Sequence, residues 1–148
     1  MRNIPVAEIL EKKGRQVHTI RPDRSVHDAI LMLVAQKVGS LVVTDGDKVV
    51  GILTERDVLI ENARRFDQIA ETRVDEVMTR HVVFGHPAQT VDQVMHVMTE
   101  KRIRHLPILE HDRLAGLISI GDVVKVQLSE ASDQIEHLSN YITGKYPG

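Results

Sequence analysis

The chain has 148 residues, of which 42% are hydrophobic but only 3% aromatic, and its formal net charge is −2. This balance lacks the basic surface and the stacking side chains of nucleic-acid binders, so no nucleic-acid partner is expected. The absence of Cys excludes disulfides, thiolate catalysis and zinc–thiolate sites, and no apolar run reaches the roughly 20 residues that span a bilayer. We therefore expect one cytoplasmic module over residues 1–148 that makes no use of a membrane.

The first half of the chain predicts the order strand, helix, strand, strand, helix. Apolar residues at helical or strand spacing, Ser or Thr at helix starts and an Asp-Gly turn signal mark the elements. In chain order we expect a strand over 17–20, a helix capped by Ser25, hairpin strands over 40–44 and 49–53, and a helix capped by Thr54.

The second half repeats the first at a fixed offset of 65 residues, as from Gly51 to Gly116. The expected elements are a strand over 81–84, a helix capped by Thr90, hairpin strands over 106–109 and 114–118, and a helix capped by Ser119. A short helical segment precedes each half, with an offset of 68 residues from Val6 to Val74, so the first half carries three extra residues in its loop over 11–16. A repeat of this kind predicts that any site in one half has a partner in the other.

The last predicted helix is much longer than its counterpart in the first half. Its apolar positions step by three and four residues: Ile120, Val124, Leu128, Ala131, Ile135, Leu138 and Ile142. Such a stripe belongs to an amphipathic helix, which either packs on its own module or crosses a subunit interface. We expect residues 131–148 to form a C-terminal helical extension.

The motif Gly-x-x-Thr/Ser-x-x-Asp occurs once in each half, where a hairpin strand runs into a helix. The hydroxyl of Thr54 or Ser119 stands at a helix N-terminus, beside unpaired N–H groups that suit phosphate. The carboxylate of Asp57 or Asp122, one turn later, accepts two hydrogen bonds and suits the vicinal diol of a ribose. The same spacing is also a capping box, which serves only the helix itself. Both interpretations stay open on the motif alone.

The two halves differ beside this motif. Lys37-Val38-Gly39-Ser40 aligns with Arg102-Ile103-Arg104-His105, and Gly121 stands where the first half has Arg56. Arginine offers a planar fork that matches phosphate, and a nearby histidine adds charge at lower pH. We infer two unequal sites, with phosphate charge held by Arg56, Arg104 and His105; the alternative for the last two is a solvated strand edge.

In sequence and order these segments resemble a tandem pair of cystathionine-β-synthase (CBS) domains, a Bateman module of the stand-alone bacterial type. The resemblance rests on Gly51–Asp57, on Gly116–Asp122 and on Arg102-Ile103-Arg104-His105-Leu106-Pro107-Ile108, and it covers the chain from about Val6 to Leu128. It implies an α/β fold in which two β-α-β-β-α repeats, over 6–66 and 74–130, pack about a pseudo-twofold axis.

The resemblance further implies two clefts between the repeats that bind adenosine-containing ligands. AMP is the expected ligand, with ADP, ATP, NAD or S-adenosylmethionine as possibilities and Mg²⁺ only as a companion of the nucleotide. Asp57 and Asp122 then hold ribose, and Thr54 and Ser119 lie near phosphate. Adenine lies against the first strand of a repeat, which implicates His18, Thr19 and Ile20, or Val82, Val83 and Phe84.

Other chemistry has little support in the sequence. Eight His residues show no metal-ligand spacing, and no nucleophile elbow is present. We therefore expect no metal site and no enzyme, but an adenine-nucleotide sensor that forms a homodimer and acts on an effector protein. The alternative is a structural or docking module with decayed nucleotide sites, and a weaker one is a nucleotide-hydrolysing enzyme.

Overall fold

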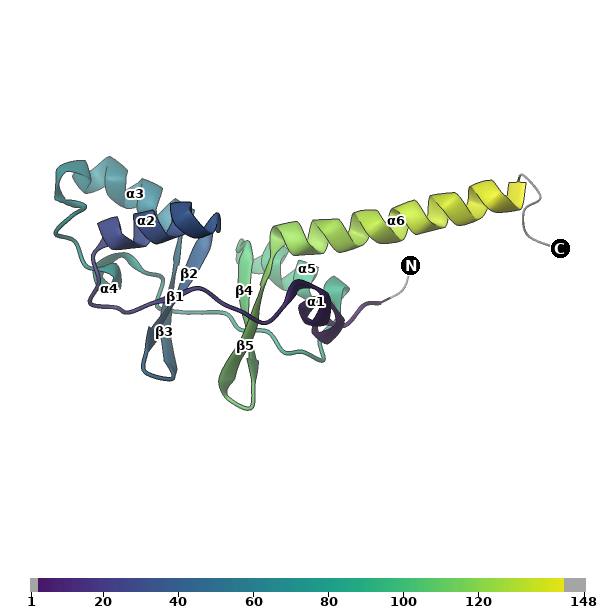
Figure 1. The fold of residues 1–148 in the computed structure, drawn as a ribbon, viewed down its shortest axis with the longest axis horizontal. Helices are drawn as coiled ribbons and strands as arrows, with labels where there is room; N and C mark the ends of the chain where they lie inside the picture. The colour runs from purple at the N-terminus through teal and green to yellow at the C-terminus, as the bar shows by residue number, and fades with distance from the viewer. Residues whose placement is uncertain (1–2, 143–148) are drawn as a thin grey trace.

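The computed structural model describes residues 3–142, with side chains described as far as residue 139. The first half contains α1 (Val6–Lys13), β1 (Thr19–Ile20), α2 (Val26–Gln36), β2 (Ser40–Asp45), β3 (Lys48–Thr54) and α3 (Glu55–Arg65). After a 3-10 turn, η1 (Phe66–Gln68), the second half contains α4 (Val74–Val77), α5 (Val91–Lys101), β4 (His105–Glu110), β5 (Arg113–Ser119) and α6 (Ile120–Ile142). The α/β class and the long last helix are confirmed, and the order helix, strand, strand, helix recurs in both halves (Figure 1).

The predicted caps explain where the helices begin. Ser25 Oγ accepts a hydrogen bond from Asp28 N at 3.0 Å, and Thr90 Oγ1 accepts one from Gln93 N at 3.3 Å. Each bond satisfies one of the N–H groups that a first helical turn leaves unpaired.

The strand predicted over His81–Phe84 is wrong. The first repeat has a three-stranded sheet in which β1 pairs in parallel with β2, whereas β4 and β5 form a two-stranded sheet. In the first repeat Val42 N donates to His18 O at 3.1 Å, but the residue at the corresponding place in β4 is Pro107, which has no N–H. The second repeat retains only a bridge between Gly85 and Ile108.

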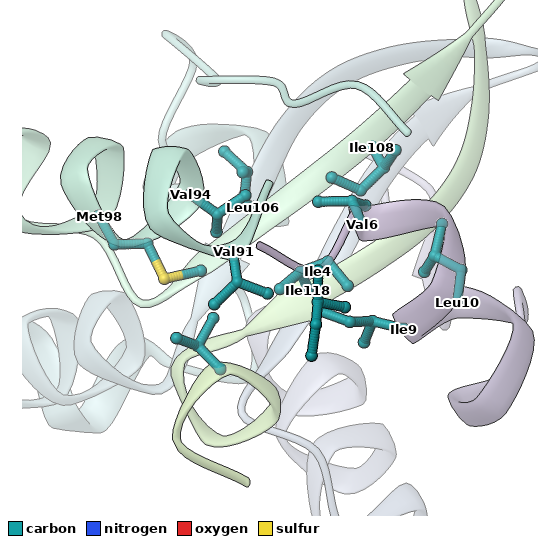
Figure 2. Close-up of a cluster of buried hydrophobic side chains, with 11 residues drawn as sticks. Ile4, Val6, Ile9, Leu10, Val91, Val94, Met98, Leu106, Ile108 and Ile118 are labelled. Atoms are coloured by element: carbon teal, nitrogen blue, oxygen red, sulfur yellow. The ribbon is translucent and has the colours of Figure 1, made fainter. Parts of the chain in front are cut away.

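The two short lead-in helices are exchanged between the repeats. Helix α1 precedes the first repeat but packs in the core of the second, beside α5 (Figures 1 and 2). Helix α4 precedes the second repeat but contributes to the core of the first. The core that contains α1 comprises Ile4, Val6, Ile9, Leu10, Val91, Val94, Met98, Leu106, Ile108, Ile118 and Val123.

The exchange follows the pseudo-twofold symmetry of the repeat. Pro5 forms a backbone bridge with Thr90 at the start of α5, and the equivalent Arg73 forms one with Ser25 at the start of α2. Each core is therefore completed by a segment that lies outside its own repeat in the sequence.

Apolar side chains are exposed along the outer part of α6, which extends away from the rest of the molecule (Figure 1). Leu128, Ile135 and Leu138 are exposed by 65%, 67% and 60%. The interpretation that the stripe packs on its own module is therefore wrong for these three positions. The side chain of Ile142 lies outside the described residues. No helix within residues 3–142 combines the length and the apolar character needed to cross a bilayer.

Candidate functional site

The first copy of the repeated motif stands where β3 runs into α3. Thr54 Oγ1 accepts from Asp57 N at 3.2 Å, and Asp57 Oδ2 accepts from Thr54 N at 3.0 Å, which completes a capping box. The hydroxyl of Thr79, which follows α4, lies 3.4 Å from both carboxylate oxygens of Asp57. Asp57 is half-buried. Its partner outside the capping box is the neutral Thr79 hydroxyl, which comes from the lead-in segment of the second repeat.

The second copy stands where β5 runs into α6 and has the same local bonds. Asp122 Oδ2 accepts from Ser119 N at 2.8 Å, and Ser119 Oγ accepts from Asp122 N at 3.2 Å. Its outside partner is charged: Lys13 Nζ, at the end of α1, lies 2.5 Å from Asp122 Oδ2. The same ammonium donates to Leu117 O at 2.7 Å.

Both capping boxes therefore form, and the capping interpretation of the motif describes real contacts. These contacts use one oxygen of each carboxylate, Oδ2, to close the helix. A carboxylate has about four acceptor positions, so capping leaves acceptor capacity on each aspartate. Capping and ligand binding are compatible at the same residue.

Arg104 and His105 lie beside the second copy. Ile120 N, the first residue of α6, donates to Arg104 O at 2.8 Å, and His105 stands opposite Ser119 in the β4–β5 register. The predicted phosphate-binding pair is thus adjacent to the start of α6, with Arg104 exposed and His105 half-buried.

The His105 side chain reaches across to the first repeat. A Cβ added to Gly39 would lie 3.1 Å from His105 Nε2, so a side chain at position 39 would require the ring to shift by a few tenths of an ångström. Burial lowers the pKa of His105 from its usual 6.5; the positive charges of Lys13 and Arg104 act in the same direction. The negative charges of Glu55 and Asp122 oppose this shift. Groups from both repeats therefore act on one imidazole.

The other predicted site residues have no hydrogen bond to either aspartate among those that the structure gives. Arg56 is exposed on the first turn of α3. Of the first-strand residues, Ile20 is buried, Thr19 is exposed and His18 is half-buried. Val82, Val83 and Phe84 are half-buried and non-helical, and they follow Thr79 in the chain.

Sequence reasoning missed Lys13, Thr79 and Glu55, which lie at or near the aspartates and His105. Each aspartate contacts the lead-in segment of the opposite repeat: Asp57 contacts Thr79, and Asp122 contacts Lys13. The sequence offered one signal, the three-residue insertion over 11–16, which contains Lys13 and changes the offset between the halves from 68 to 65 residues.

A cavity of about 520 Å³ lies between α1 and α6 and reaches the second copy of the motif. Its lining carries both charges: Lys12, Lys13 and Lys125 together with Glu8, Asp122, Glu130 and Asp133, beside the apolar Ile4, Ile9 and Val126. Within residues 3–142 no group of three or more His, Asp or Glu side chains is arranged to hold a metal ion.

Comparison with known proteins finds CBS-domain proteins by family model, by sequence and by structure. The model of the CBS domain family matches residues 5–63 and 74–129. The CBS domain-containing protein CBSX3, mitochondrial, of Arabidopsis thaliana is 30% identical over 150 residues, which cover 95% of this chain and 73% of that protein. The crystal structure of the CBS-domain containing protein ATU1752 from Agrobacterium tumefaciens superposes with a TM-score of 0.81 at 44% identity, covering 83% of this chain and 98% of that one.

One solved structure of the same fold carries ligands. The CBS domain pair of protein MJ0100 was crystallised in complex with 5′-methylthioadenosine and S-adenosyl-L-methionine. It superposes with a TM-score of 0.74 at 24% identity and covers 87% of this chain and 99% of that chain.

Proposed function

The chain belongs to the CBS-domain family as a tandem pair, and from that premise we propose that it is a regulatory module whose repeats bind an adenosine-containing ligand between them. AMP is the first candidate, followed by ADP, ATP, NAD and S-adenosylmethionine, with Mg²⁺ only as a companion of the nucleotide. The module acts by binding and conformational change; it is not proposed to be an enzyme.

The observation that carries this proposal is the doubled pairing of a helix-capping hydroxyl with an aspartate that also contacts the other repeat. Asp57 and Asp122 retain acceptor capacity for a ribose diol. The N-termini of α3 and α6 favour negative charge, as a phosphate group provides. Arg104 and His105 add donors beside the second of these positions. The MJ0100 complex supports the proposal, since the same fold there accommodates two adenosine derivatives.

The proposed mechanism is a shift in population between arrangements of the two repeats. Each aspartate lies at the seam where one repeat meets the lead-in segment of the other. A ligand held there contacts both sides of the seam, so it stabilises the arrangement in which they are close. An effector protein then binds one arrangement better than the other.

We further propose that the module is a homodimer. An open apolar groove of about 540 Å³ lies between α2 and α3 and is lined in part by Val34 and Leu59. These two side chains are exposed by 72% and 68%, a degree of apolar exposure that association would reduce.

A second candidate function is favoured by the exposed stripe on α6. In this alternative, Leu128, Ile135 and Leu138 dock a partner and the nucleotide sites have decayed. It predicts a stable assembly without nucleotide affinity.

Isothermal titration with AMP, ADP, ATP, NAD and S-adenosylmethionine tests the proposal, with Asp57→Asn and Asp122→Asn as the decisive variants. Asparagine keeps one carbonyl oxygen for the capping bond but removes the charge and the second acceptor of the carboxylate. We expect the double Asn variant to keep its melting temperature and to lose about tenfold or more in affinity. The matched Ala variants should lose both stability and affinity.

Unchanged affinity in the double Asn variant would refute the assignment of the aspartates. Absence of binding by the wild-type protein to all five ligands would favour the docking module. Turnover of ATP or NAD that Asp122→Ala abolishes would instead support a hydrolase.

A further inference from the structure

We propose that Lys13 makes the second cleft selective for adenosine ligands that carry an anionic group, while the first cleft discriminates less. This inference rests on the proposed function and adds the class of ligand that each cleft takes.

The two clefts differ in the residue that the lead-in segment presents to the aspartate and to the neighbouring strand. In the first repeat, Thr79 and Ile52 exchange two backbone hydrogen bonds of 2.9 and 3.0 Å, and the Thr79 hydroxyl faces Asp57. Leu117 corresponds to Ile52 in the second repeat, and its carbonyl accepts instead from the ammonium of Lys13. That single ammonium also pairs with Asp122, so a cation takes the place of a neutral residue.

The ion pair affects ligands unequally. A ribose diol that bonds to both oxygens of Asp122 competes with Lys13 for Oδ2, the oxygen that the ammonium contacts. An uncharged adenosine takes Asp122 from the ammonium and offers no anion in exchange, whereas a phosphate provides a new one on the ligand itself. A charge-assisted bond is roughly twice as strong as a neutral one. The bond between Lys13 and the anionic group of the ligand should therefore account for the difference in affinity between charged and uncharged adenosine ligands.

The surroundings allow this exchange. The side chains of Lys13 and Asp122 are exposed by 33% and 20%, and both border the cavity between α1 and α6. Lysine is a flexible point charge with three donors, so it can leave the carboxylate and stay within reach. Arg104 lies at the same end of α6, since its carbonyl accepts from Ile120 N at 2.8 Å, so this residue is a second cation beside the helix start.

The test isolates each cleft with the aspartate variants and compares AMP with adenosine by titration calorimetry. In the Asp57→Asn protein, which retains the second cleft, we expect AMP to bind about tenfold or more tightly than adenosine. Lys13→Met in that background should abolish most of this ratio, by weakening AMP while adenosine is unchanged or tighter. In the Asp122→Asn protein, which retains the first cleft, Lys13→Met should leave the ratio unchanged.

Three further variants separate charge from structure. Lys13→Gln keeps a donor for Leu117 O but removes the charge, so it should behave like Lys13→Met. Lys13→Arg keeps the charge and should keep the preference for AMP. Lys48→Met, at the exposed tip of the β2–β3 hairpin, removes a lysine away from the clefts and should change neither affinity.

The outcomes are distinguishable. If the wild-type protein binds neither ligand, the proposed function fails and the inference fails with it. If it binds both, but the ratio in the second cleft survives Lys13→Gln, only the inference is overturned. Equal weakening of AMP and adenosine by both neutral variants would also overturn it, because Lys13 would then serve the fold and not the choice of ligand.

Discussion

Leu10 packs so closely on Gly116 that a Cβ added at position 116 would lie 2.6 Å from Leu10 Cδ2. Leu10 belongs to α1 and is fully buried, while Gly116 lies in the middle of β5. The pseudo-symmetric contact is that of Met78 with Gly51, where an added Cβ would lie 2.5 Å from the sulfur. Each glycine therefore admits the lead-in helix of the opposite repeat.

Gly116→Ala is expected to destabilise the protein by about 1–3 kcal/mol, because the added methyl group overpacks a buried contact. Urea denaturation measures the change. Leu10→Ala should also destabilise, by about 2–5 kcal/mol, through the cavity that it leaves. The double variant should be more stable than the sum of the two costs, since the new methyl group enters that cavity. Strict additivity would show that the two residues do not share a contact in solution.

Glu61 is a buried carboxylate whose side chain is only 6% exposed, and Arg65 Nε lies 3.0 Å from its Oε1. The distance fits an ion pair, although the pair is not aligned as a hydrogen bond. Arg65→Ala should cost about 1–2 kcal/mol, less than for a fully buried pair, because the Arg65 side chain is half exposed. Thermal and chemical unfolding of Arg65→Ala and of Glu61→Gln/Arg65→Ala provide the check. The double variant should recover most of the loss, and a double variant as unstable as the single one would contradict this account.

His105 should make the protein less stable at acidic pH. Burial lowers the pKa of His105 in the folded protein, so the unfolded chain takes up this proton first as the pH falls. The contribution of the neutral imidazole is complete above the ordinary pKa of 6.5 and is lost as the pH falls from there through the lowered value. Denaturation at several pH values should therefore show a smaller pH dependence for His105→Gln. His27→Gln, on the exposed face of α2, is the control and should retain the wild-type slope.

Leu128→Lys and Ile135→Lys should dissociate any assembly that uses α6 while leaving the protomer folded. Both side chains are about two-thirds exposed, so their replacement removes little buried area within the chain. Light scattering after size-exclusion chromatography gives the mass, and circular dichroism reports the fold. Gln134→Lys adds the same charge at a neighbouring exposed position and should leave the mass unchanged. An unchanged mass in the two stripe variants would exclude α6 from the assembly.

The repeated elements could be predicted because they depend on local pattern. Ser25 and Thr90 start helices wherever the chain places them, and an Asp-Gly turn closes its hairpin from its own residues. The absence of a strand over His81–Phe84 could not be predicted in this way, because it depends on whether the neighbouring strand can pair with that segment. Pro107 in β4 has no N–H to donate, so the neighbouring segment gains no ladder there.

The aspartates could be found from spacing, but their outside partners could not. Thr54 and Ser119 lie three residues before their aspartates, a distance that the helix itself fixes. Lys13 lies 109 residues before Asp122, and only the exchange of α1 brings the two together. That long-range packing, and with it the difference between the clefts, depends on tertiary structure.

The crossing of α1 and α4 has a consequence for the origin of the protein. A single ancestral repeat of this kind would lack the helix that completes its own core, because its lead-in segment packs on a neighbour. Two separate copies satisfy both cores by swapping their lead-in segments, as a domain-swapped dimer does. Gene duplication and fusion convert that intermolecular swap into an intramolecular one, and thereafter each repeat can diverge. Lys13, which has no charged counterpart at Asp57, is an example of such divergence within one chain.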